Sequence, residues 1–351
     1  MGTFKLYRRL TIVAPGVVLL STLSPPTARA WGPDGHHTVA AIADQLLKGT
    51  SAATQVRAIL GGVGLEDAAV WADCAKGVNT TTFVYDNAGK FPECAPFENP
   101  LGEAAMIDFV KRNATNCNPK PTEETCHKQY HYADIAIQHD HYDLSFVGAR
   151  NDDVSAAITA AIAVLQNKNA PSPFSIKDQR EALLLLTHYV GDIHQPLHVG
   201  AIYLDPKGKP VNPDKGQFDP TTETKGGNFI SVKASNLHAT WDAIPASLKD
   251  TKVNAAWVKA AKAVASTTGP ISSWSTGWAS DTQKEAQKAF ANLAFGPQKL
   301  GKWSTKLPSS YSKSMSAIKK TQLTKGGARL AQLLSAIWPD AMASDGPAKN
   351  R

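Results

Sequence analysis

Apolar residues recur at helical spacing through most of the chain. The clearest cases are 154–165 (VSAAITAAIAVL) and 177–190, where apolar positions three and four apart share one helix face. The same spacing predicts further helices over 38–47, 51–60, 103–110, 237–241, 253–265, 281–294 and 325–337. The alternation that indicates a strand is scarce, and 228–232 (NFISV) is its best example, as half of a small β-hairpin. The pattern therefore predicts an all-α fold with at most a small hairpin.

Two long irregular stretches interrupt the helical pattern. Residues 77–130 contain scattered prolines, and residues 203–225 are polar and rich in proline and glycine. The sequence shows no internal repeat and no stretch with the composition of a domain linker. We expect a single mostly helical domain over residues 31–345, with long loops.

The first 30 residues have the pattern of a secretory signal peptide. Basic residues at positions 5, 8 and 9 precede a mostly apolar run over 10–23, and the segment ends in the small-x-small sequence Ala28-Arg29-Ala30. A membrane anchor is the alternative, but the run is shorter than the ~20 residues that a span needs, and no later segment of the sequence is long and apolar enough. Cleavage after Ala30 would release a secreted or periplasmic protein that begins at Trp31.

Four cysteines fit an oxidising compartment: Cys74, Cys94, Cys117 and Cys126. They allow three pairings, between which the sequence does not decide, although proximity favours Cys74–Cys94 and Cys117–Cys126. A zinc site made of four thiolates is the alternative. It is disfavoured because no two cysteines have the C-x2-C spacing.

Composition and charge exclude two classes of protein. With 25 glycines and 22 prolines in 351 residues, the chain is neither collagen-like nor disordered in composition. The formal net charge is +7, of which the signal-like segment carries +4 through four basic residues and no acidic one, leaving +3 for the rest. That surplus is too small to predict a surface module that binds nucleic acid through a basic stripe.

The candidate chemistry lies in histidine and aspartate residues at fixed spacing. His188 and Asp192 are four residues apart, and His238 and Asp242 repeat this spacing, so each pair lies on one helix face. A single such pair is more often a surface ion pair. Two pairs, the first among leucines that predict burial, favour a cation, since a buried carboxylate needs a partner. Zinc accepts such nitrogen and oxygen ligands.

Other motifs complete an ordered set. In chain order they read W-G-x3-H from Trp31, W-A-D ending at Asp73, H-Y-x-D from His131, H-x2-G-D-x2-Q-P-L-H from His188, G-G-N ending at Asn228 and N-L-H-x2-W-D ending at Asp242. The set resembles the type I nuclease family, the trinuclear-zinc, single-strand-specific nucleases of fungi with their plant and bacterial relatives. The resemblance implies the helical fold that these enzymes share with zinc phospholipase C.

The resemblance also implies three zinc ions per chain and a ligand set. One zinc would be held by Asp73, His131, His188 and Asp192. A close neighbour would take the α-amino nitrogen and carbonyl oxygen of Trp31, with His36 and the shared carboxylate of Asp192. A third zinc would take His198, His238 and Asp242. The remaining histidines, among them His194, His139 and His141, receive no metal.

Catalytic and binding roles follow from the same resemblance. Asp73 would orient the attacking water, and Lys76, three residues later, would face the phosphate, where the alternative is a solvated surface lysine. Tyr132 would stack an unpaired base, Asp134 would read its edge and Asn228 would complete the pocket. For Tyr132 and Asp134 the alternatives are core packing and a helix cap.

We therefore expect a zinc-dependent phosphodiesterase, a monomer that hydrolyses single-stranded DNA and RNA to 5′-phosphorylated products and also acts on 3′-nucleotides. Two alternatives are a zinc phospholipase C and an exported zinc-binding protein. Asp242, where the phospholipase has glutamate, and Asp134 favour the nuclease, while Lys76 and the aromatic residues disfavour a storage role. The long loops depart from the compact fungal members, so base preference and the choice between DNA and RNA stay open.

Overall fold

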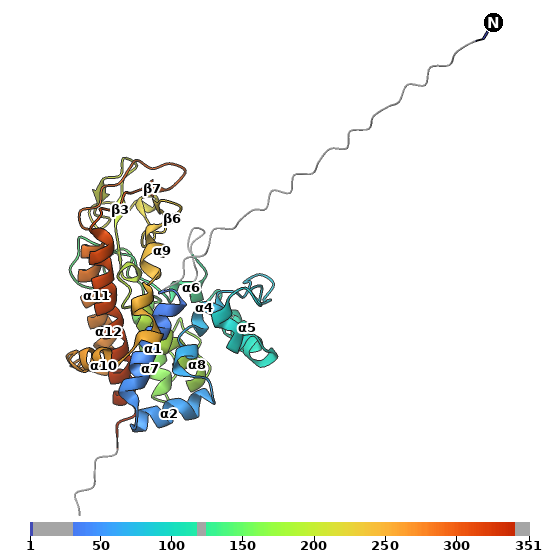
Figure 1. The fold of residues 1–351 in the computed structure, drawn as a ribbon, viewed down its shortest axis with the longest axis vertical. Helices are drawn as coiled ribbons and strands as arrows, with labels where there is room; N and C mark the ends of the chain where they lie inside the picture. The colour runs from blue at the N-terminus through green and yellow to red at the C-terminus, as the bar shows by residue number, and fades with distance from the viewer. Residues whose placement is uncertain (3–30, 118–123, 341–351) are drawn as a thin grey trace, which may run out of the picture.

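The computed structural model describes residues 1–2, 31–117 and 124–340, and helices dominate it (Figure 1). The α-helices are α1 (Pro33–Leu47), α2 (Ser51–Leu60), α3 (Leu65–Ala68), α4 (Trp71–Ala75), α5 (Pro100–Asn113), α6 (Cys126–Gln129), α7 (Val154–Leu165), α8 (Gln179–Asp192), α9 (Leu237–Asp242), α10 (Ala255–Lys262), α11 (Trp274–Phe290) and α12 (Tyr311–Ile337). Short 3-10 helices are η1 (Pro92–Phe97), η2 (Pro196–His198), η3 (Pro220–Thr222), η4 (Ala246–Leu248), η5 (Asp250–Lys252) and η6 (Ile271–Ser273). The predicted all-α class is confirmed.

The long helices pack into one bundle around α8. Helix α1 packs along α12, α7 packs along α8, and α8 also contacts α1 and α12. Every residue of α8 from Glu181 to Asp192 is buried, which explains its unbroken apolar run. The close approach of α12 to α1 needs glycine, because a Cβ at Gly327 would come within 2.5 Å of the Ile42 Cβ. The bundle thus fixes the helix that carries the first H-x3-D pair.

Short strands lie at one end of the bundle (Figure 1). They are β1 (Ile135–Ala136), β2 (Gly200–Ala201), β3 (Tyr203–Leu204), β4 (Pro210–Val211), β5 (Ile230–Val232), β6 (Ser235–Asn236) and β7 (Trp303–Ser304). Strand β1 pairs in parallel with β2, β3 forms a hairpin with β4, and β5 pairs antiparallel to β6 and parallel to β7. The predicted small hairpin is β5–β6, which places α9 directly after it.

Local signals explain which helices the sequence predicted well. Helices α2 and α7 have the predicted bounds, with Thr50 accepting from the Ala53 N–H and Asp153 from the Ser155 N–H as N-caps. Helices α11 and α12 begin earlier than predicted because their first turns are polar. There, tertiary packing of Trp278 and Tyr311 decides the structure, rather than local propensity.

Parts of the two stretches expected to be irregular are ordered. The first contains α5, which includes the helix predicted over 103–110 and extends it at both ends, and Asn99 caps it by accepting from the Gly102 N–H. The second contains the β3–β4 hairpin. The favoured disulfides Cys74–Cys94 and Cys117–Cys126 are both formed. They join α4 to η1, and α6 to the segment after α5.

Two expectations concern export and the membrane. The signal peptide expected over residues 1–30, with its cleavage site after Ala30, lies almost wholly outside the described residues. None of the helices in the described part of the chain combines the length and the apolarity that spanning a bilayer requires.

Candidate metal centre

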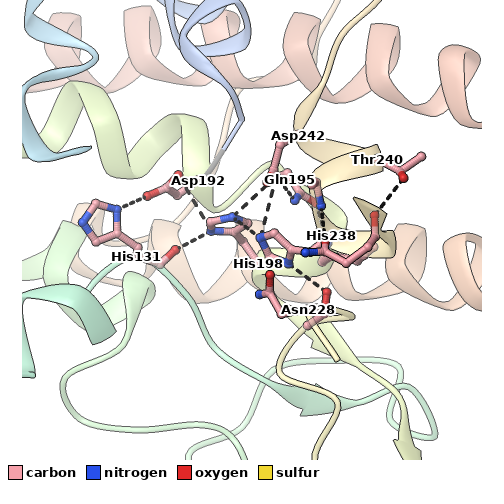
Figure 2. Close-up of polar contacts among 12 residues, drawn as sticks. His131, Asp192, Gln195, His198, Asn228, His238, Thr240 and Asp242 are labelled. Atoms are coloured by element: carbon pink, nitrogen blue, oxygen red, sulfur yellow. Dashed lines mark hydrogen bonds and ion pairs between the residues drawn. The ribbon is translucent and has the colours of Figure 1, made fainter. Parts of the chain in front are cut away.

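The predicted histidine and aspartate ligands lie together in the structure, although they come from distant parts of the chain. Figure 2 shows five of them: His131, Asp192, His198, His238 and Asp242. Their sources are α1 for His36, α4 for Asp73, the segment before β1 for His131, α8 for His188 and Asp192, η2 for His198, and α9 for His238 and Asp242. The ligand atoms form three groups, each within 4.8 Å: His36–Asp73–His188, His131–His188–Asp192 and His198–His238–Asp242. His188 belongs to two of these groups, so they adjoin.

The first two groups meet at the end of α8. His188 Nε2 lies 3.1 Å from Asp192 Oδ2, and His131 Nδ1 lies 2.9 Å from the same oxygen. Asp73 Oδ1 is 3.7 Å from His188 Nε2. On the other carboxylate oxygen, His36 Nε2 lies 3.4 Å from Asp192 Oδ1. Asp192 therefore presents its two oxygens to two different sets of imidazoles, as a bridging ligand must.

The third group is built by η2 and α9. His198 and His238 bring their Nε2 atoms to 3.0 Å, and Asp242 Oδ1 lies 3.7 Å from the His238 Nε2. Gln195 donates from Nε2 to the same Asp242 oxygen at 2.8 Å, which fixes the carboxylate (Figure 2). This group contains the second H-x3-D pair and His198, which Pro196 redirects at the end of α8.

The tautomers of these histidines show that their lone pairs converge. Nδ1 lies 2.6 Å from the Ala69 carbonyl in His188, 2.8 Å from the His131 carbonyl in His198 and 2.8 Å from the Gly226 carbonyl in His238. A carbonyl only accepts, so each Nδ1 carries a proton. Burial lowers the pKa of His198 and of His238, so the neutral Nε2 of each presents a lone pair. Two lone pairs facing each other at 3.0 Å repel unless a cation lies between them. Backbone bonds to the far nitrogen are the usual support of metal-binding histidines, so the donor set fits zinc.

Burial favours the neutral, metal-binding form of two of the candidate histidine ligands. It lowers the pKa of His36 to about 4, helped by His188, and the pKa of His238 to about 3, helped by His198. For Asp192 burial acts the other way, but the neighbouring His188 holds the pKa of this carboxyl well below its usual range. Neutral imidazoles and an ionised carboxylate are the forms that ligate a metal.

Trp31, the remaining predicted ligand, lies next to the centre. Trp31 is fully buried, and the N–H of the neighbouring Gly32 donates to the Asp242 carbonyl at 3.0 Å. Gly35 packs so closely on the Trp31 side chain that a Cβ there would come within 2.7 Å of it. The ligand role of the Trp31 backbone stays a prediction.

Lys76 is not a solvated surface lysine. Its Nζ lies 2.8 Å from Asp73 Oδ1, and its side chain is only 18% exposed. Burial opposes its charge, but Asp73 and Asp192 raise the pKa of Lys76 above its ordinary value. A permanent cation therefore stands beside the candidate metal groups.

A pocket of about 380 Å³ opens beside the third group. His131, His198 and His238 line it on the metal side, together with Lys76. The predicted base-binding residues Tyr132, Asp134 and Asn228 line it as well, as do Glu124, Lys128, Leu197, Lys225, Gly226 and Phe229. One space thus adjoins the metal groups, an ammonium and an aromatic ring.

Asp134 carries a strongly perturbed carboxyl group in the pocket. Burial, followed by the nearby Glu223 carboxylate, raises the pKa of Asp134 to about 7. Its Oδ1 atom is buried and has no hydrogen-bond partner among the described residues. A ligand with donors would satisfy this oxygen. Neither core packing nor a helix cap explains why this oxygen is buried without a hydrogen-bond partner.

Sequence reasoning did not assign several lining residues to the site, among them Lys128, Lys225 and Phe229. Lys225 and Phe229 immediately flank the G-G-N motif, so their position was a usable signal. Lys128 lies three residues before His131 in a stretch expected to be irregular, and no local pattern indicates that it faces the pocket.

Comparison with known proteins decides the family. A sequence profile described as S1/P1 Nuclease matches residues 31–339, most of the chain. The chain belongs to the S1/P1 nuclease family. The matched region includes every candidate ligand and the whole pocket lining, and it confirms the resemblance read from the ordered motifs. Members of the S1/P1 nuclease family depend on zinc, in keeping with the donor set described above.

Plant members of the S1/P1 nuclease family resemble the chain over shorter regions. Endonuclease 5 of Arabidopsis thaliana is 26% identical over 242 residues, covering 67% of this chain and 61% of that protein. Endonuclease 1 of the same plant is 31% identical over 121 residues, 32% of this chain and 33% of that protein. Endonuclease 2 is 36% identical over 83 residues, 22% of each chain. The matched region is thus less than two thirds of the length of these relatives.

Proposed function

We propose that this chain is a zinc-dependent nuclease that hydrolyses phosphodiester bonds in single-stranded DNA and RNA to 5′-phosphorylated products, with 3′-nucleotidase activity. The observation that carries the proposal is the pocket that adjoins the convergent histidine lone pairs on one side and Tyr132, Asp134 and Asn228 on the other. Membership of the S1/P1 nuclease family and the similarity to plant endonucleases support it.

The proposed ligand sets are those that the family resemblance implies. One ion takes Asp73, His131, His188 and Asp192, a second takes the Trp31 backbone, His36 and Asp192, and a third takes His198, His238 and Asp242. When bound, zinc supplies Lewis acidity and lowers the pKa of water toward neutrality. Three ions and this division among them are part of the proposal.

The chain's own residues do the rest. Asp73 accepts a hydrogen bond from the attacking water and thereby orients that water. Lys76, whose Nζ lies 2.8 Å from Asp73 Oδ1, donates a hydrogen bond to a phosphate oxygen as the negative charge on this oxygen grows. Tyr132 offers a ring for stacking and Asp134 an acceptor for a base edge. A pocket that takes one base selects nucleic acid in which bases are unpaired.

Compartment and assembly state belong to the same proposal. The two disulfides fit a protein that is secreted or exported to a periplasm after cleavage between Ala30 and Trp31, leaving a domain over residues 31–345. We expect it to act as a monomer on nucleic acid and 3′-nucleotides.

The test is activity of the mature chain on single-stranded DNA, RNA, 3′-AMP and phosphatidylcholine, before chelation, after chelation and after zinc is restored. The proposal expects hydrolysis of the first three substrates, loss in chelator and recovery with zinc. Full activity in chelator would refute the zinc dependence. Cleavage of phosphatidylcholine alone would favour the phospholipase.

A further inference from the structure

Two lysines outside the expected catalytic set face the pocket. Lys128 and Lys225 line it together with Lys76, although they come from segments almost a hundred residues apart in sequence. Lys76 already stands beside Asp73 and the metal groups, so it serves the phosphate that is cleaved. The other two ammonium groups have no role in the reaction described above.

Lys128 is held at the pocket by covalent and hydrogen bonds. It lies on α6, two residues after Cys126, which is fully buried and joined to Cys117. The Lys128 N–H donates to the Thr125 carbonyl at 2.8 Å, and the next side chain, Gln129, donates to the Glu124 carbonyl at 2.8 Å. These contacts fix the backbone of the short helix that carries Lys128.

The Lys128 ammonium makes no ion pair and no hydrogen bond with any residue that the structure describes. Glu124 lines the same pocket, four residues earlier, yet does not approach within ion-pair distance of it. The side chain is half-buried. A half-buried cation facing a pocket without an acidic partner there is suited to an anionic ligand.

Lys225 is held by the G-G-N turn. It adopts a left-handed backbone with φ 50°, and its carbonyl accepts from the Asn228 N–H at 3.0 Å and from the Asn228 Nδ2 at 2.9 Å. Its Nζ lies 5.4 Å from the centre of the Phe229 ring, a cation–π contact. The two residues that follow Gly227 thus keep Lys225 at the rim of the pocket.

We propose that Lys128 and Lys225 form subsites for the phosphates that flank the cleaved phosphate in a polynucleotide. The inference rests on the proposed nuclease function. Successive phosphates of a single strand each carry one negative charge, and cations along the groove of a single-strand-binding protein follow them. A mononucleotide, whose only phosphate is taken by the metal groups and Lys76, gains nothing from these two lysines. The subsites therefore select chains over mononucleotides.

Substrates of graded length separate these subsites from the catalytic centre. The dinucleotide dTpdT has one phosphate and no flanking one, whereas a thymidine hexanucleotide has flanking phosphates on the cleaved bonds. Lys128→Ala and Lys225→Ala should each raise KM for the hexanucleotide about three- to tenfold, the range of one charge-assisted contact at a partly exposed site. KM for dTpdT and for 3′-AMP, and kcat for all three, should stay unchanged.

Binding gives a readout that does not need turnover. With a fluorescent phosphorothioate thymidine hexanucleotide and zinc-loaded protein, each substitution should lower the slope of log affinity against log salt by about 0.7, the value for one contact with a single strand. Lys207→Ala is the matched control, since Lys207 is an exposed loop lysine that does not line the pocket. Lys128→Arg should keep the wild-type slope.

Two results would overturn the proposal. An unchanged salt slope in both alanine variants would mean that neither lysine contacts phosphate, and equal KM changes on dTpdT and the hexanucleotide would place them at the cleaved phosphate. In either case the wild-type chain still cleaves single strands if the proposed function is right. A wild-type chain that binds with a lysine-dependent slope but cleaves nothing would refute the function and keep the subsites.

Discussion

Replacing Lys76 by alanine tests most directly whether this lysine stabilises the transition state of the proposed reaction. Lys76 Nζ lies 2.8 Å from Asp73 Oδ1, and the two side chains are 18% and 7% exposed. Water screens such a sheltered cation little, so its interaction with charge that grows on a phosphate oxygen is stronger than at the surface. Removing one preorganised donor of this kind costs about 2–4 kcal/mol of transition-state stabilisation. That loss corresponds to a fall in kcat of about 30-fold to 1000-fold.

The assay is steady-state hydrolysis of single-stranded DNA with zinc content measured on the same samples. Lys76→Ala should keep all its zinc, because Lys76 is a partner of Asp73 and no ligand, while Lys76→Arg should recover part of the rate. Lys249 gives a matched control, since its Nζ also lies 2.8 Å from a carboxylate oxygen, that of Asp34, but at an exposed surface site. Lys249→Ala should leave kcat unchanged.

An unchanged kcat in Lys76→Ala with full zinc would refute the reasoning. Loss of zinc in parallel with loss of rate would assign Lys76 a structural role, in which it merely holds Asp73 for the metal.

Four further changes have distinct expected outcomes. Asp192→Asn should abolish activity and lower the content of two zincs, because both carboxylate oxygens face imidazoles; metal analysis that finds the full zinc content would exclude a bridging role. One extra Met before Trp31 should remove most activity and one zinc, because the nitrogen of Trp31 becomes an amide, and trimming to a free Trp31 should restore both. Tyr132→Ala should weaken nucleotide binding by about 1–3 kcal/mol and have less effect on bis(p-nitrophenyl) phosphate; equal losses would indicate a packing defect. Burial and the Asp250 carboxylate raise the pKa of Glu66 to about 7 from its ordinary 4.5. The contribution of Glu66 to folding stability is therefore fully present below pH 4.5 and is lost as pH rises through about 7. Thermal unfolding of Glu66→Gln should show a gain in Tm at pH 8 that vanishes at pH 4, and a Tm difference that does not change with pH would contradict the raised pKa.

The two H-x3-D pairs of candidate ligands were predictable from the sequence because their spacing is local. The geometry in which all the candidate ligands meet was not, because it depends on tertiary assembly. The H-x3-D spacing places His188 with Asp192 and His238 with Asp242 on their helices without any knowledge of the fold. Only the fold brings His198 Nε2 to 3.0 Å from His238 Nε2. The family resemblance supplied the grouping that spacing alone does not contain.

The fold shows the same division between local and tertiary causes. Helices α2 and α7 have clear periodicity and capping side chains at their starts, so their bounds followed from the sequence. The first half of α12 did not, since residues such as Lys319 lack an apolar signal. Lys319 is fully buried, and its Nζ donates to the Thr240 carbonyl at 2.8 Å at the end of α9. No window of sequence around Lys319 predicts such a partner.

The packing of α12 has a consequence for how the protein is made. Every proposed ligand precedes residue 243, but α1, which carries His36, packs along α12, and Lys319 of α12 donates to the Thr240 carbonyl of α9. A chain still emerging from the ribosome at residue 300 therefore holds all its proposed ligands and lacks the helix that positions two of the elements carrying them. Completion of synthesis becomes a condition for the complete centre. We expect a truncation before α12 to abolish metal binding while removing none of the proposed ligands.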